Sequence, residues 1–111
     1  MKRVFNKLVR DNIPNIIEGN GETSITRVLD EKEYRSELYK KLLEEANEVV
    51  NAKNKEDVLE ELADVLEVLI SIAELESKSL NDVIEIANQK RLKRGGFKKR
   101  IFLEETHDKF E

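Results

Sequence analysis

The stretch "EELADVLEVLISI", residues 60 to 72, decides the fold of this chain. It is the most apolar run of the sequence, yet it carries Glu61 and Asp64 three positions apart. Its leucine, isoleucine and valine residues recur at intervals of three and four, which is the spacing of a helical face. Further apolar residues lie outside that face, so several sides of the helix need neighbours. The stretch therefore predicts a helix that packs inside a bundle and that also carries carboxylates into this bundle.

The segment before this stretch predicts a second long helix. Asp30 is in a suitable place for an N-cap, and Glu33 follows at the third helical position. Apolar residues then continue at the same three-four spacing to about Ala52. We expect this helix to pack beside the one that contains residues 60 to 72.

The remaining helix boundaries follow from caps and stops. Asn54 is a suitable cap for the central helix, which we expect to run to about Ser77. A third helix is expected after Ser79 and ends at Gly95, because glycine commonly terminates helices. Near the N-terminus the sequence allows only a short helix after Pro14. The segments "SITRVL" and "RIFLEE" are expected to be extended arms or short strands.

The connection between the first two long helices is short, which predicts an antiparallel pair. The apolar surface of the central helix is too broad for one neighbour to cover. We therefore expect an all-α fold: a helical hairpin plus a third helix, assembled into an oligomeric four-helix bundle with two helices from each chain. Residues 1–111 are expected to form a single domain.

The composition excludes several classes of protein. Charged residues make up 40% and aromatic residues 5%, a mixture typical of amphipathic helices. The net charge of −4 argues against general attraction to nucleic acid or anionic membranes. The chain has no cysteine, which excludes disulfides, thiolate zinc sites and cysteine nucleophiles. No apolar stretch has the length of a signal-peptide core or a membrane span, so we expect a cytoplasmic protein without a membrane partner.

Two pairs of carboxylates are expected to face each other across the hairpin. Glu45 and Glu48 share one helical face, and so do Glu61 and Asp64. With the turn near residue 53 or 54, the two pairs differ in height by about two residues, or ~3 Å along the helix axis. The pairs can therefore lie level with each other.

Four converging carboxylates repel one another unless cations lie between them. Oxygen ligands favour hard cations, Mg²⁺ first and Mn²⁺ second. Iron is disfavoured because the sole histidine, His107, lies in the tail and not in a Glu-x-x-His motif of the bundle. A solvated acidic face is the alternative interpretation. Asp64 argues for the metal site, because aspartate is a poor helix former and here lies between Ala63 and Val65.

Two basic segments are candidates for binding phosphate. In "KRLKRGGFKKR", residues 90 to 100, seven of eleven positions are Lys or Arg. The alternatives are a helix C-terminus whose cations favour the helix dipole, and a nucleic-acid patch. In "NKLVRDNIP", Lys7 and Arg10 could face phosphates if the segment packs over the acidic site. Otherwise this segment is an N-terminal arm that holds a dimer together.

The motif "EEANE", followed after twelve residues by "ELAD", resembles the signature of the MazG-like all-α nucleotide pyrophosphohydrolases. From Asn6 to about Glu105 the chain also resembles their phosphoribosyl-ATP pyrophosphohydrolase-like branch. The segments that carry this second resemblance, in order, are "NKLVRDNIP", "ITRVL", "LLEEANEV", "EELADVLEVL" and "KRLKRGGFKKRIFLEE".

The resemblance implies an Mg²⁺-dependent enzyme that cleaves a nucleoside triphosphate between the α and β phosphates and acts as a homodimer or homotetramer. It implies that the metal ligands are Glu45, Glu48, Glu61 and Asp64. It assigns Glu44 to orienting or deprotonating the attacking water. With the resemblance, the expected phosphate contacts are Lys7, Arg10, Lys90, Arg94 and Lys98.

The stretch "ADVLEVL" departs from the histidine-pathway enzyme, in which an aromatic residue and a histidine soon follow Ala-Asp. A housecleaning role on a canonical or modified nucleotide is therefore expected ahead of phosphoribosyl-ATP hydrolysis in histidine biosynthesis. Two alternatives stay open. One is a helical interaction module with a solvated acidic face, and the other is a nucleic-acid binder that uses the basic tail.

Overall fold

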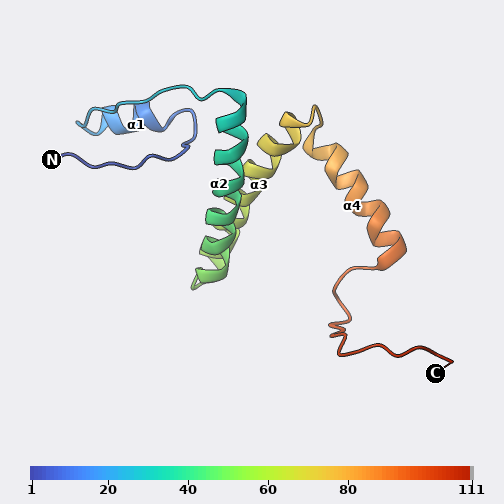
Figure 1. The fold of residues 1–111 in the computed structure, drawn as a ribbon. Helices are drawn as coiled ribbons and strands as arrows, with labels where there is room; N and C mark the ends of the chain where they lie inside the picture. Colours follow the sequence, from blue (N-terminus) through green and yellow to red (C-terminus); the bar gives the residue numbers. More distant parts are fainter. Residues whose placement is uncertain (111) are drawn as a thin grey trace. The chain divides into compact units, whose positions relative to one another are not determined.

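The computed structural model describes residues 1–110 and contains four α-helices (Figure 1). These are α1 (Ile13–Gly19), α2 (Glu31–Asn51), α3 (Lys55–Leu75) and α4 (Leu80–Arg94). No strand occurs among the described residues, which confirms the predicted all-α class. The two segments expected as arms or strands, residues 24–29 and 100–105, contain neither helix nor strand.

The helix starts and stops follow the predicted caps. The side chain of Asp30 accepts a hydrogen bond of 2.8 Å from the backbone N–H of Glu33, at the start of α2. Asn54 does the same for Asp57 at the start of α3, at 2.9 Å. Gly95 follows α4 with a φ of +80°, a backbone conformation that glycine adopts without strain. Local sequence therefore sets the limits of the three long helices.

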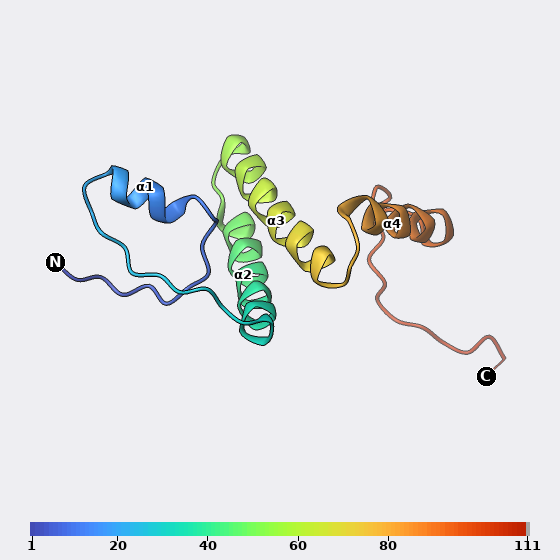
Figure 2. The ribbon, with the colours of Figure 1, turned by 90° about the horizontal axis from the view of Figure 1, so that it is seen from above.

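Helices α2 and α3 form the antiparallel hairpin that positions the candidate site (Figures 1 and 2). Its most buried side chains are Leu38 on α2 and Val68 and Ala73 on α3. Val68 is one of the apolar residues outside the main apolar stripe of the central helix, and it is buried. It lies seven residues after Glu61, so it continues the line along which α3 meets α2.

The hairpin also exposes a broad apolar face. On α3 it consists of residues spaced three and four apart that are 38–57% exposed: Leu59, Leu62, Leu66 and Leu69. On α2 the exposed residues at matching intervals are Tyr39, Leu43 and Val50. Because a residue advances by about 100° around a helix, both stripes lie on the same side of the contact line, and Asp64 lies on the other side. We call this surface the leucine face.

The described residues form two compact units, one from Met1 to Leu80 and one that begins at Asn81. The first unit contains α1 and the hairpin, and the second contains most of α4 and the basic segment. No residue of α4 is buried, and its apolar residues Val83 and Ile84 are exposed in this chain. None of the helices in residues 1–110 is both long and apolar enough to cross a lipid bilayer.

Candidate metal centre

Three carboxylates converge between α2 and α3. Glu45 comes from α2, and Glu61 and Asp64 come from adjacent turns of α3. Each offers one oxygen, and these oxygens all lie within 4.8 Å of one another. All three side chains are partly buried, and that of Glu45 is only 14% exposed. The hairpin thus brings together acids that are 16 to 19 positions apart in the chain. We call these three residues the carboxylate cluster.

Glu61 lies at the electrostatic centre of the cluster. Partial burial raises the pKa of its carboxyl group above the ordinary value of 4.5. The negative charges of Asp64, Glu48 and Glu45 raise this pKa further, in that order of size. The cluster therefore opposes its own ionisation, and a cation placed between its oxygens would relieve that repulsion.

Two acids of the predicted motif lie at the edge of the cluster. Glu48 is exposed and stands one turn after Glu45, outside the group of converging oxygens. Its charge still reaches Glu61, whose pKa it raises. Glu44 is also exposed, and its carboxylate lies 3.5 Å from the ammonium group of Lys41. The structure thus brings three of the four expected ligands together and leaves Glu48 and Glu44 beside them.

Lys41 is a residue of this site that sequence reasoning missed. Its side chain is only 18% exposed, and its ammonium group lies 3.6 Å from Glu45 as well as 3.5 Å from Glu44. The signal was present, because Lys41 precedes Glu44 by three positions and Glu45 by four, and such pairs meet on a helix surface. Lys41 balances part of the negative charge on the α2 side of the cluster.

Arg10 approaches the cluster from outside the hairpin. Its guanidinium group donates a hydrogen bond of 2.7 Å to Oδ1 of Asp64, across 54 positions of sequence. Sequence analysis expected Arg10 near the site if its segment packed there, and the structure places it on one of the acids. Figures 1 and 2 show the segment before α1 alongside the hairpin.

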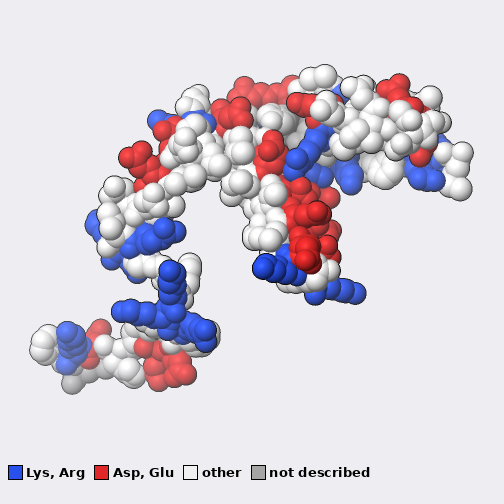
Figure 3. Space-filling view, turned by 180° about the vertical axis from the view of Figure 1, so that it is seen from behind, with Lys and Arg blue, Asp and Glu red and all other residues white. Residues whose placement is uncertain are grey.

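The other predicted cations lie elsewhere. Lys7 is exposed, and its ammonium group lies over the ring of Phe5, 5.9 Å from the ring centre. Lys90 and Arg94, one turn apart on α4, and Lys98 after it are exposed residues of the second unit. Figure 3 shows basic side chains gathered at the end of α4 and on the segment after it, and acidic side chains gathered along the hairpin.

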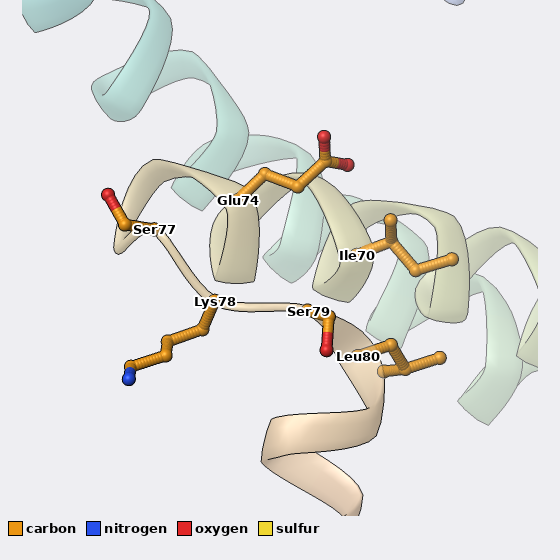
Figure 4. A pocket seen from close by; sticks show the side chains of 6 residues that line it. All are labelled: Ile70, Glu74, Ser77, Lys78, Ser79 and Leu80. Carbon is orange, nitrogen blue, oxygen red and sulfur yellow. The ribbon is translucent and has the colours of Figure 1, made fainter.

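A separate hollow of about 490 Å³ lies where α3 ends (Figure 4). Its lining residues are Ile70, Glu74, Ser77, Lys78, Ser79 and Leu80. Figure 4 shows the side chains of Ile70 and Leu80 directed to one side, whereas Lys78 points away from them. This hollow has one carboxylate and no converging acids, so it lacks the chemistry of the carboxylate cluster.

The carboxylate cluster fits a hard divalent cation. Its donors are all carboxylate oxygens, which Mg²⁺ and Mn²⁺ prefer. Mg²⁺ commonly uses only a few protein carboxylates, with water and substrate phosphates as its other ligands. No nitrogen ligand belongs to the group, which disfavours the sites that zinc and iron usually occupy.

Comparison with known families agrees with this geometry. Residues 34–96 match the model of the MazG nucleotide pyrophosphohydrolase domain, a stretch that contains both α2 acids and α3 acids of the site. No curated protein and no solved structure matches the chain. The chain belongs to the MazG nucleotide pyrophosphohydrolase family, whose members are hydrolases that generally depend on divalent metal.

Proposed function

We propose that this MazG family member is an Mg²⁺-dependent nucleoside triphosphate pyrophosphohydrolase. It cleaves between the α and β phosphates and yields a nucleoside monophosphate and pyrophosphate. The observation that carries the proposal is the convergence of Glu45, Glu61 and Asp64 in a chain of this family. Mn²⁺ would serve as a second metal, since it accepts the same oxygen ligands.

Each acid has a proposed task. Glu45, Glu61 and Asp64 hold the cation, and Glu48 supplies a fourth ligand from the edge of the cluster. When bound, such a cation neutralises phosphate oxygens and lowers the pKa of water. Glu44, which Lys41 holds at 3.5 Å, orients or deprotonates the water that attacks phosphorus.

Protein cations complete the charge balance of the triphosphate. Arg10 and Lys41 are proposed to act beside the cluster, where they lie within 4 Å of its acids or of Glu44. Lys7 and the exposed cations Lys90, Arg94 and Lys98 are proposed to contact the phosphate chain. Replacing Lys98 by Gln should raise KM without changing Mn²⁺ affinity, and an unchanged KM would remove it from this set.

The substrate is proposed to be a canonical or damaged nucleoside triphosphate in a housecleaning role. The support is the sequence "ADVLEVL" after the second motif, which lacks the aromatic residue and histidine of the phosphoribosyl-ATP enzyme. Residues 1–111 are proposed to act as one functional domain. A basic tail alone would instead bind oligonucleotides with steep salt dependence.

The leucine face is proposed to be covered by a second copy of the chain in a homodimer or homotetramer. Its leucines recur every three or four positions along α3, which is the pattern that packs helix against helix in a bundle. In a single chain they remain 38–57% exposed. Assembly through this face would leave Asp64, on the other side of the contact line, open to substrate.

A pyrophosphate-release assay tests the function. The purified chain is incubated with Mg²⁺ and each of a panel of natural and damaged nucleoside triphosphates, with phosphoribosyl-ATP included. We expect equal amounts of pyrophosphate and monophosphate from at least one nucleotide, and no product when Mg²⁺ is chelated. Release of orthophosphate would move the cleavage site and contradict the proposal.

The rival interpretation, an interaction module with a solvated acidic face, predicts a different thermal melt. A cation that binds only the folded cluster raises the unfolding midpoint, because it stabilises the folded chain by RT ln(1 + c/Kd), where c is the free cation concentration. A solvated face responds weakly and equally to Mg²⁺ and to K⁺ at matched ionic strength. A midpoint insensitive to both Mg²⁺ and Mn²⁺ would favour the rival.

A further inference from the structure

Arg10 connects the N-terminal segment to the carboxylate cluster. The segment reaches α3 through the 2.7 Å hydrogen bond from the Arg10 guanidinium to Asp64 Oδ1. Arg10 also stands where α1 begins, because its carbonyl oxygen accepts a hydrogen bond of 3.0 Å from the backbone N–H of Ile13. Arg10 therefore links Asp64 of α3 to the start of α1.

The ion pair is one of the contacts that the segment before α1 makes with the hairpin. Among the described residues, α2 and α3 are the helices that pack against each other, and α1 packs against neither of them. Leu8 and Val9 beside Arg10 are partly buried, whereas residues 1–7 are exposed. With side-chain exposures of 56% and 41%, Arg10 and Asp64 form a pair that is weak enough to exchange.

We propose that Arg10 is an exchangeable cation, which pairs with Asp64 until a divalent metal binds and then transfers to a phosphate of the substrate. This inference rests on the proposed function and deepens it. Asp64 is shared, since the same carboxylate belongs to the cluster and accepts the hydrogen bond from Arg10. A divalent cation on Asp64 repels the guanidinium group, so the two cations compete for it.

The coupling between metal binding and the Arg10 contact is reciprocal, so it can be measured as a change in metal affinity. If metal binding weakens the Arg10 contact, Arg10 must weaken metal binding by the same factor. Once free, its planar guanidinium group is suited to two parallel hydrogen bonds to phosphate. Arg10 should therefore oppose the binding of metal and favour the binding of a phosphate chain. A residue that merely stabilises the fold would not act on the two ligands in opposite directions.

The first measurement is the affinity of the full chain for Mn²⁺ alone, by titration calorimetry or by the loss of free Mn²⁺ signal in electron paramagnetic resonance. We expect Arg10→Ala to tighten Mn²⁺ binding by about 3- to 10-fold, the range of a modest coupling between sites. The matched control is Arg27→Ala, which removes the same charge and an exposed ion pair with Glu33 outside the cluster. It should change the affinity less than twofold.

The second measurement uses inorganic tripolyphosphate with the Mn²⁺-saturated protein. Arg10→Ala should bind tripolyphosphate several-fold more weakly than the unaltered chain, and Arg10→Lys should recover part of the loss. Hydrogen exchange of the amides of residues 4–12 should quicken when Mn²⁺ saturates the chain. Weaker Mn²⁺ binding in Arg10→Ala, or no change, would overturn the inference, because Arg10 would then position Asp64 or have no link to the metal.

The two proposals fail in different ways. If the unaltered chain binds no Mn²⁺, the metal centre of the proposed function fails and Arg10 has no metal with which to compete. If Mn²⁺ binds and pyrophosphate is released while Arg10→Ala leaves Mn²⁺ affinity unchanged, only the inference about Arg10 fails. Circular dichroism of each variant shows whether the helices persist, as expected for an exposed side chain.

Discussion

Glu61 is a carboxylate whose ionised form lowers the stability of the folded chain and which is proposed to hold a cation. Partial burial and the negative charges of Asp64, Glu48, Glu45 and Asp57 raise the pKa of Glu61, so its ionised form is disfavoured in the folded chain. A divalent cation placed among these carboxylates would favour their ionised forms. The arrangement that disfavours ionised Glu61 is therefore one that a bound cation would stabilise.

The raised pKa of Glu61 gives a pH prediction. Its carboxyl group binds a proton more tightly in the folded than in the unfolded chain, so its contribution to stability is fully present below pH 4.5. That contribution is lost as the pH rises through the raised pKa. In metal-free buffer, Glu61→Gln should therefore gain stability relative to the unaltered chain as the pH increases from 4.5 to 7.

Thermal melts at several pH values, with chelator present, measure this difference. Glu60→Gln is the control, because it removes an exposed neighbouring charge outside the cluster. The difference in unfolding midpoint between Glu60→Gln and the unaltered chain should stay nearly constant over the same pH range. With saturating Mn²⁺ the unaltered chain should be stabilised more than Glu61→Gln, because the variant lacks a carboxylate that is proposed to hold the cation. A variant whose relative stability falls with pH in chelator would contradict the raised pKa.

Asp64→Asn and Glu48→Gln test the ligand set. Both keep the size of the side chain and remove its charge, and both should lower turnover by about 100-fold or more if each holds the metal. Circular dichroism should be unchanged, because both residues are partly or fully exposed. Pyrophosphate release under saturating nucleotide is the measurement. Full activity in Glu48→Gln would restrict the ligands to the three converging acids.

At the scale of elements, the hairpin could be predicted from the sequence because its helix caps and its short turn depend on residues that are close together in the chain. Asp30 and Asn54 cap their helices through hydrogen bonds that span three residues. The level alignment of acids followed from a short turn and the helical rise. The contact between Arg10 and Asp64 could only be stated conditionally, since it spans 54 positions and no periodic pattern fixes it.

Asn54 provides a stability test of the hairpin. Its side chain caps α3 by accepting from the backbone N–H of Asp57, so Asn54→Ala should cost about 1 kcal/mol of unfolding free energy. Asn51→Ala is the control, because Asn51 only donates to the carbonyl oxygen of Asn47 in its own helix. Urea denaturation compares the two. A loss in Asn51→Ala as large as that in Asn54→Ala would show that the cap is not the cause.

At the scale of the whole molecule, the hairpin carries both the candidate metal centre and the surface proposed for assembly. The leucine face lies on one side of the line along which α2 and α3 meet, and Asp64 of the carboxylate cluster lies on the other side. The breadth of the apolar surface predicts a partner chain, and four leucines of α3 are exposed in a single chain. Residues 90 to 100 have no apolar periodicity, so no packing could be predicted for this basic segment.

The leucine face predicts the behaviour of the chain in solution. Light scattering at micromolar concentration should give a multiple of the 12.9 kDa chain mass. Leu66→Lys places a charge in the middle of the face and should shift the chain toward monomer. Glu67→Lys introduces a lysine at the next position, which lies away from the leucine face, and should leave the mass unchanged. A monomeric unaltered chain would contradict the proposed bundle.

The short connection between α2 and α3 also bears on the order of events during folding. Only residues 52–54 separate the two helices, so the contacts between them are close in sequence. Helical proteins with such contacts fold within about microseconds to milliseconds. Association of two chains at cellular concentrations is slower and depends on concentration. The carboxylate cluster would therefore form within a single chain, and metal binding at it would not have to await assembly with a partner.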